Sequence, residues 1–148
     1  GWSVAMDLLP YERSTALWHR GAYLHRRLSQ IIEQAPEGAL DPAAVGDVFL
    51  QLFSFRARSL ATQHRLDAGE TLGAETSIDK VLLATVEQSV FDLALDALPD
   101  ELVLGDTGTG PRWRSEFLYS RAATIYGGSA EIQRNIIARR LLDLGADR

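Results

Sequence analysis

Two adjacent glycines, Gly127 and Gly128, form the part of the sequence best suited to holding a ligand. They follow Tyr126 and precede Ser129, a residue type that commonly caps the amino terminus of an α-helix. Glycines let the backbone turn sharply and let another group approach it closely. The next helix would direct its unpaired N–H groups and its positive dipole end toward that group. Such a corner can bind an anion or a carbonyl oxygen, although a helix that merely restarts after a capped turn shows the same pattern.

Other sequence features exclude several kinds of site. The chain has no cysteine, which excludes disulfides and thiolate metal sites. His19, His25 and His64 do not occur in the E-x-x-H spacing of a di-iron bundle, so we expect no metal site. The glycine-rich segment 105–110 lacks the Lys-Ser/Thr pair of a P-loop. The net charge of -5 argues against nucleic-acid binding, and no apolar run reaches the roughly 20 residues that span a bilayer.

The elements that position the glycine corner are predicted to be helices. Apolar residues recur at spacings of three and four, and no segment alternates for long enough to indicate a strand. Asp79 and Glu87 lie largely off the apolar stripe of their helix. Long helices joined by short loops favour an all-α fold, an up-and-down four-helix bundle with an additional terminal helix, formed by residues 1–148 as one domain. We place the helices at about residues 2–34 with a break at Pro10, 41–68, 76–98, 112–124 and 129–144, and a long irregular loop at 99–111.

Three segments resemble the carboxy-terminal domain of acyl-CoA dehydrogenases. IYGGSAEIQRNIIARRLL at 125–142 resembles the family's signature, in which tyrosine, a variable residue, glycine and Thr or Ser precede an E/Q-I-Q-R run. GWSVAMDLLPYERS at 1–14 resembles the start of the family's carboxy-terminal bundle, and residues 77–98 resemble its third helix. The resemblance implies a fragment of a three-domain enzyme, in which an amino-terminal helical domain and a middle β-domain accompany this bundle.

The resemblance also implies α,β-dehydrogenation of acyl-CoA thioesters with FAD as cofactor. In that reaction a carboxylate removes a proton from Cα while a hydride passes from Cβ to the flavin. Many family members carry this glutamate directly after the signature tyrosine, where this chain has Gly127. Others carry it before an arginine on the first helix, as in Glu12–Arg13. Glu12 is therefore the candidate base, and a solvated first-turn glutamate is the alternative. Gly127 is the candidate backbone donor to the thioester carbonyl, and Arg13 and Tyr126 are candidate substrate-binding residues.

Cofactor contacts and partners follow from the same resemblance. Ser129 and Glu131 match positions that contact the ADP part of the flavin in relatives. For Glu131 we expect a ribose hydroxyl or a backbone amide as partner, and a residue that only stabilises the helix start is the alternative. The expected substrate is a fatty or bulky, sterol-side-chain type of acyl-CoA, and the expected electron acceptor is an electron-transfer flavoprotein. The expected assembly is a homo- or hetero-tetramer, and the expected location is cytoplasmic.

Some family motifs are missing from the sequence. Residues 26–38 do not match the family's R-x-Q-F-G-x-P run, and residues 102–117 differ in glycine spacing from its Q-x-x-G-G-x-G run. Leu118–Tyr119 replaces the usual Arg-Asp pair. These differences keep two alternatives open, which are a non-catalytic acyl-CoA dehydrogenase-like subunit and a helical scaffold or interaction domain. We expect the isolated chain to fold but to be inactive alone.

Overall fold

The chain folds into helices joined by turns and loops. The computed structural model describes residues 1–145, apart from the side chains of Met6, Pro10 and residues 13–16. Within this part there is no strand, which confirms the all-α fold class. No helix of the described part is long and apolar enough to cross a membrane. The elements are α1 (Trp2–Gln34), α2 (Pro42–Asp67), α3 (Thr76–Ala97), α4 (Pro99–Val103), α5 (Gly110–Arg121), the 3₁₀ turn η1 (Ala122–Thr124) and α6 (Ala130–Arg140).

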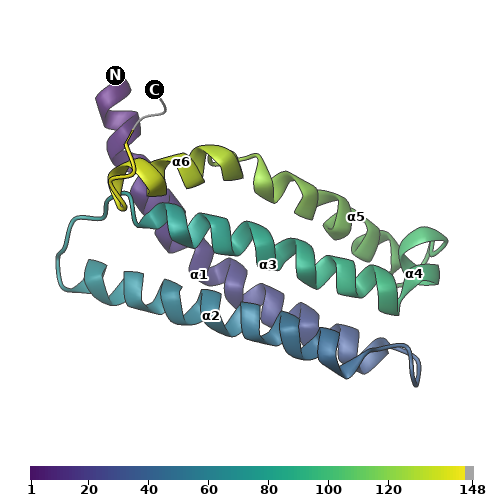
Figure 1. The fold of residues 1–148 in the computed structure, drawn as a ribbon. Coiled ribbons are helices and arrows are strands. Elements are labelled where there is room, and N and C mark those ends of the chain that lie inside the picture. The colour runs from purple at the N-terminus through teal and green to yellow at the C-terminus, as the bar shows by residue number, and fades with distance from the viewer. Residues whose placement is uncertain (146–148) are drawn as a thin grey trace.

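The helices form an up-and-down bundle around α3 (Figure 1). α1 and α2 pack against one side of α3, and α5, η1 and α6 run back along its other side. α5, η1 and α6 therefore form the fourth column of the bundle together, and the helical structure of this column is interrupted between η1 and α6. The core consists of apolar side chains from all four columns, among them Leu24, Leu52, Val90, Phe91 and Trp113. The interruption lies against the first half of α3, so the two-glycine corner is held by the bundle rather than by a free loop.

Because α3 has neighbours on nearly every side, two of its carboxylates are buried. The sequence pattern placed Asp79 and Glu87 off the apolar stripe, yet both are almost completely buried. Glu87 accepts hydrogen bonds from the Arg20 guanidinium at 2.5 and 3.2 Å. Asp79 accepts one from Arg58 at 2.8 Å and one from the Thr62 hydroxyl at 2.7 Å. Buried charges require such partners, and the partners come from α1 and α2, which are distant in sequence.

Two local expectations were wrong. α1 continues through Pro10 without the predicted break. A proline removes one backbone donor, and the hydrogen bonds of the flanking turns maintain the helix. The predicted irregular loop at 99–111 contains α4, which starts with Pro99 at its first position and buries Leu102. Proline is well suited to that position because the first N–H groups of a helix have no intrahelical acceptor.

Gly21 provides a test of the close contact between α1 and α2. A Cβ at this position would lie 2.8 Å from the Phe55 ring. We expect Gly21→Ala to lower the free energy of unfolding by about 1–3 kcal/mol, the usual cost of overpacking a core. Gly46, inside α2, has open space around its Cβ position, so Gly46→Ala should raise it by about 0.5–1 kcal/mol. Urea unfolding of both variants measures the contrast, and equal effects would contradict it.

Candidate functional site

The two-glycine corner joins η1 to α6 in a conformation that favours glycine. Gly127 has φ 66° and Gly128 has φ 99°, in the region that residues with a Cβ rarely adopt. Ser129 then caps α6, because its hydroxyl accepts a hydrogen bond from the Ile132 N–H at 3.4 Å. The sequence therefore indicated both the turn and the cap correctly. After the corner, α6 runs along the neighbouring surface of α3 (Figure 1).

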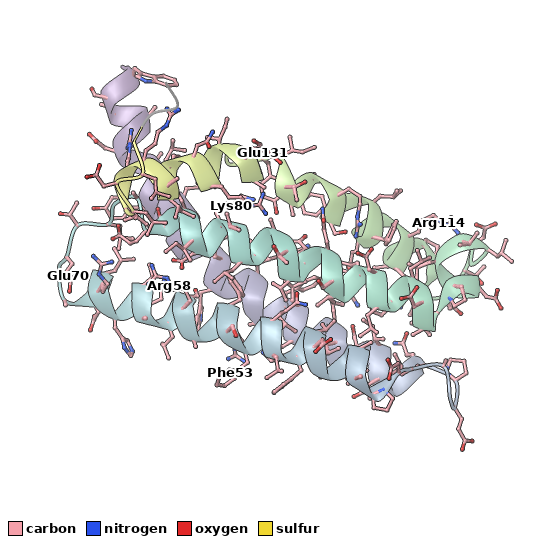
Figure 2. The ribbon with its side chains drawn as sticks, viewed as in Figure 1. Phe53, Arg58, Glu70, Lys80, Arg114 and Glu131 are labelled. Atoms are coloured by element: carbon pink, nitrogen blue, oxygen red, sulfur yellow. The ribbon has the colours of Figure 1, made fainter. Side chains whose placement is uncertain are left out.

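Two buried side chains hold the corner, and neither was a candidate from the sequence. Lys80 lies on the side of α3 that faces α6 (Figure 2) and donates to the Ala123 carbonyl at 2.5 Å. Its ammonium group also lies 4.3 Å from the centre of the Tyr126 ring. Gln133, on α6, donates its amide N–H to the Gly127 carbonyl at 2.9 Å. The position of Gln133 in the E-I-Q-R run was a usable signal, whereas the burial of Lys80 depends on packing between helices.

Tyr126 is part of a cluster of aromatic and charged groups beside the corner. Its ring lies 6.0 Å from that of Tyr119, and the Arg20 guanidinium lies 5.5 Å from the Tyr119 ring centre. Partial burial, followed by the nearby charge of Glu87, raises the pKa of Tyr126 to about 12, while 38% of the residue stays exposed. Tyr126 is therefore a neutral phenol at physiological pH, able to donate or accept a hydrogen bond but not suited to act as a base.

A groove of 650 Å³ opens at the glycine corner. Gly127 and Gly128 form part of one wall, and Trp2 and Leu9 of α1 contribute to another. The remaining wall comes from the start of α3, the preceding loop and α6, including Leu72, Ser77, Ile132, Ile136 and Arg140. Most of these side chains are apolar, and the Ser77 hydroxyl is buried without a hydrogen-bond partner among the described residues. The groove can therefore accept an apolar chain and offers polar groups at its corner.

Glu12 lies near the margin of this groove rather than in its lining. It is exposed on α1, three residues after Leu9, which does line the groove. Residues three apart on a helix are neighbours, with about 5–6 Å between their Cβ atoms. The structure thus brings Gly127 into the groove and Glu12 within about one helical turn of it. The side chain of Arg13 lies outside the described residues.

Ser129 and Glu131 lie at the start of α6. The Ser129 hydroxyl is engaged in the helix cap. Glu131 is exposed, and hydrogen bonds from its own backbone amide and from Ser129 lower its pKa. Glu131 is therefore an ionised acceptor on the surface, with its carboxylate accessible to a ligand hydroxyl (Figure 2). No group of three His, Cys, Asp or Glu residues that could hold a metal ion occurs among the described residues.

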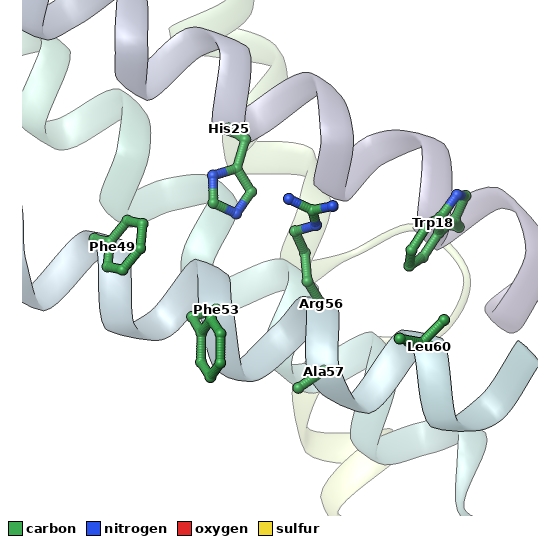
Figure 3. A pocket seen from close by; sticks show the side chains of 7 residues that line it. All are labelled: Trp18, His25, Phe49, Phe53, Arg56, Ala57 and Leu60. Atoms are coloured by element: carbon green, nitrogen blue, oxygen red, sulfur yellow. The ribbon is translucent and has the colours of Figure 1, made fainter.

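A second groove lies between α1 and α2, on the opposite side of the bundle from α6 (Figure 3). Phe49, Phe53 and Leu60 make it apolar, and the Arg56 guanidinium lies 5.8 Å from the Trp18 ring centre. The described residues of its lining include one histidine, His25, and no carboxylate. These groups fit packing against another apolar surface better than they fit acid–base chemistry.

His25 should make stability depend on pH. Burial, followed by the positive charge of Arg56, lowers its pKa from the ordinary value of 6.5. The unfolded chain therefore binds a proton at a pH where the folded chain does not, and the free energy of unfolding falls as pH drops below about 6.5. Above that value this contribution is fully present. Urea unfolding at several pH values should show a steeper acid-side loss for the native sequence than for His25→Gln, and parallel curves would contradict this.

Comparisons with known proteins point to one family. The sequence model of the family described as "Acyl-CoA dehydrogenase, C-terminal domain" matches residues 1–142. The chain is 34% identical to the acyl-CoA dehydrogenase IpdE1 of Mycolicibacterium smegmatis, in a match that covers 97% of this chain and 37% of that protein. It is also 34% identical to the acyl-CoA dehydrogenase IpdE1 of Mycobacterium tuberculosis, with 97% and 38% covered. The chain thus spans less than two fifths of the length of these relatives.

Proposed function

The chain belongs to the acyl-CoA dehydrogenase family as its carboxy-terminal helical domain, and from that premise we propose that it forms part of the active site of an FAD-dependent enzyme. The proposed reaction is the α,β-dehydrogenation of an acyl-CoA thioester. One observation carries the proposal, namely that the groove at the glycine corner also includes Leu9, one turn from Glu12. The proposal is supported by backbone amides in the groove wall at Gly127 and Gly128 and by a carboxylate near its margin, which come from opposite ends of the sequence.

In this proposal the chain is one of three domains, and residues 1–148 need the other two for activity. An amino-terminal helical domain and a middle β-domain would account for the remaining length of the relatives, of which this chain covers 37% and 38%. The exposed apolar residues Trp2 and Leu8 on α1 suit contact with such a domain, since large exposed apolar patches commonly mark interfaces.

Glu12 is the proposed general base. Its carboxylate would take the proton from Cα of the acyl group, and the electron pair of that bond would form the Cα–Cβ double bond as the hydride leaves Cβ. FAD, when bound, supplies the acceptor for that hydride. The other position used for a base in the family is Gly127, which has no side chain. A Cβ there would lie 3.2 Å from Cε of Lys80, so a residue with a side chain would require the Lys80 side chain to shift and would be strained at the positive φ of Gly127.

Gly127 is the proposed donor to the thioester carbonyl through its backbone N–H. Negative charge develops on that oxygen as the Cα proton leaves, and donors already in position stabilise it. Tyr126 and Arg13 are the proposed substrate contacts. The raised pKa of Tyr126, about 12, suits a neutral hydrogen-bonding group beside the thioester.

The residues at the corner fit an oxygen-rich cofactor such as FAD. The Ser77 hydroxyl is buried without a partner among the described residues and borders the same groove, so a ligand oxygen would complete its hydrogen bonding. Ser129 at the start of α6 and the ionised Glu131 are the proposed contacts to the ADP part, with Glu131 on a ribose hydroxyl. The helix dipole at this end favours a diphosphate nearby.

The substrate would be a fatty or bulky acyl-CoA, because the groove is apolar and has a volume of 650 Å³. An electron-transfer flavoprotein would accept the electrons. We further propose a homo- or hetero-tetramer located in the cytoplasm.

A non-catalytic subunit is the second candidate function. It is favoured by the exposure of Glu12, which is outside the lining of the groove, and by the absence of a side chain at Gly127. In that case the domain would support assembly of an active partner subunit.

Purification of the full-length protein distinguishes the two candidates. We expect a yellow protein whose visible flavin band is bleached when acyl-CoA thioesters are added without oxygen. A series of straight and bulky acyl groups would then define the substrate class. A protein that takes up no FAD, or whose flavin no acyl-CoA bleaches, would exclude the catalytic function and leave the assembly subunit.

A further inference from the structure

Gln133 is buried completely, but only half of its amide group is satisfied. Its Nε2 donates to the Gly127 carbonyl at 2.9 Å. Its Oε1 is buried and has no hydrogen-bond partner among the described residues. Because a carbonyl oxygen can only accept, the amide nitrogen is the atom that must face Gly127. The donor of Gln133 is thus used, and its acceptor is left without a partner.

The unsatisfied Oε1 of Gln133 lowers the stability of the fold. A buried acceptor without a partner carries the full cost of losing its hydrogen bonds to water. An apolar side chain of similar size would remove that cost from the core, although it would leave the Gly127 carbonyl without this donor. Glutamine at this position therefore holds the Gly127 carbonyl at the cost of one unsatisfied buried acceptor.

The hydrogen bond also fixes the direction of the next amide. The described chain has no cis peptide bond, so the Gly127 carbonyl and the Gly128 N–H point in opposite directions across one planar unit. With the carbonyl held by Gln133 in the interior, the Gly128 N–H points to the other side. It has no hydrogen-bond partner among the described residues, and Gly128 lines the groove. Two consecutive glycines at positive φ could otherwise rotate this peptide easily.

We infer that Gln133 is a positioning residue, which holds the Gly127–Gly128 peptide so that the Gly128 N–H serves as a further donor to an oxygen of the bound acyl-CoA thioester. This inference rests on the proposed function of the groove. Gln133 acts by donating a hydrogen bond to the Gly127 carbonyl. A side chain of the same size that cannot donate this hydrogen bond would therefore not hold the Gly127–Gly128 peptide in place. A side chain at position 133 that donates this hydrogen bond only when protonated should therefore make the catalytic rate depend on pH.

Gln133→Glu provides that switch in the full-length enzyme. The two side chains have nearly the same shape, and burial raises the pKa of a glutamic acid. At low pH the protonated acid can donate to the Gly127 carbonyl, whereas at high pH the carboxylate repels it. We expect the variant to approach the native kcat at low pH and to fall at least about tenfold below it as pH rises, the scale of one lost hydrogen bond. Gln133→Met should be slower at every pH, with an unchanged or raised Tm and unchanged FAD content.

Asn135→Asp is the matched control, because it adds the same charge at an exposed position of α6. It should leave the ratio of variant to native kcat constant with pH. A constant ratio for Gln133→Glu, or a native kcat in Gln133→Met, would overturn the inference. The inference would also be overturned if kcat in the Gln133 variants fell only in proportion to a decrease in their Tm or FAD content.

A second measurement does not depend on activity. In this chain the Gly128 amide should give one sharp NMR signal, and Gln133→Met should broaden or split it as the peptide samples two orientations. An unchanged Gly128 signal would overturn the inference even if the variant is slow. If instead the native enzyme oxidises no acyl-CoA while the Gly128 signal responds as expected, the proposed function fails and the positioning by Gln133 stands.

Discussion

Replacing Glu12 with glutamine should slow anaerobic reduction of the flavin by acyl-CoA in the full-length enzyme by roughly 10²–10⁴-fold, the usual contribution of a general base. Glutamine keeps the size and polarity of the side chain but cannot take the Cα proton. Because the proposed base acts on the chemical step, the loss should appear in the rate of reduction. The affinity for acyl-CoA and the FAD content should change little. Stopped-flow measurement of flavin bleaching separates these quantities.

Glu33→Gln is the matched control for this change. Glu33 is exposed on the same helix, near its opposite end, so its substitution alters the charge of α1 without approaching the groove. We expect native reduction rates for it. Reduction at the native rate in Glu12→Gln would show that another group takes the proton, and the exposed position of Glu12 would then reflect ordinary solvation.

The architecture could be predicted because it depends on local patterns. Leu24, Leu28 and Ile31 recur at helical spacing and are all buried, and the stripe of α3 supplies Val86 and Val90 to the core in the same way. The cap by Ser129 and the positive φ of both glycines at the corner were also local signals. In both of these local signals the residue type favours the observed structure, because serine caps helices and glycine permits a positive φ.

The groups that hold the corner could not be predicted in this way. Lys80 and Glu87 are charged residues that a pattern of apolar spacing assigns to solvent. Both are buried because α1 and η1 supply partners from distant parts of the sequence, namely Arg20 for Glu87 and the Ala123 carbonyl for Lys80. Likewise, Glu12 and Gly127 became candidates through resemblance, whereas only the arrangement of the helices brings Gly127 into the wall of a groove that Leu9, one turn from Glu12, also lines.

The ion pair between Arg20 and Glu87 should contribute strongly to the stability of the bundle. The Glu87 side chain is 0% exposed and that of Arg20 is 24% exposed. We expect Glu87→Leu to lower the free energy of unfolding by about 3 kcal/mol, because removal of one partner leaves a charge without compensation in a poorly hydrated site. Urea unfolding of this chain at neutral pH, followed by circular dichroism, measures the change.

Two comparisons show whether burial causes this effect. In the double variant Arg20→Met with Glu87→Leu no charge is left uncompensated, so it should be more stable than Glu87→Leu alone. Glu70→Gln removes one acid from the exposed ion pair with Arg65, at 2.7 Å, and should change stability little because solvent screens such pairs. Equal losses in Glu87→Leu and Glu70→Gln would show that burial does not strengthen the Arg20–Glu87 pair.

A double variant less stable than Glu87→Leu would show that Arg20 stabilises α1 through the rings of Tyr23 and Tyr119, whose centres lie 4.7 and 5.5 Å from its guanidinium. Because Tyr119 lies beside Tyr126, that outcome would connect the stability of the bundle directly to the glycine corner.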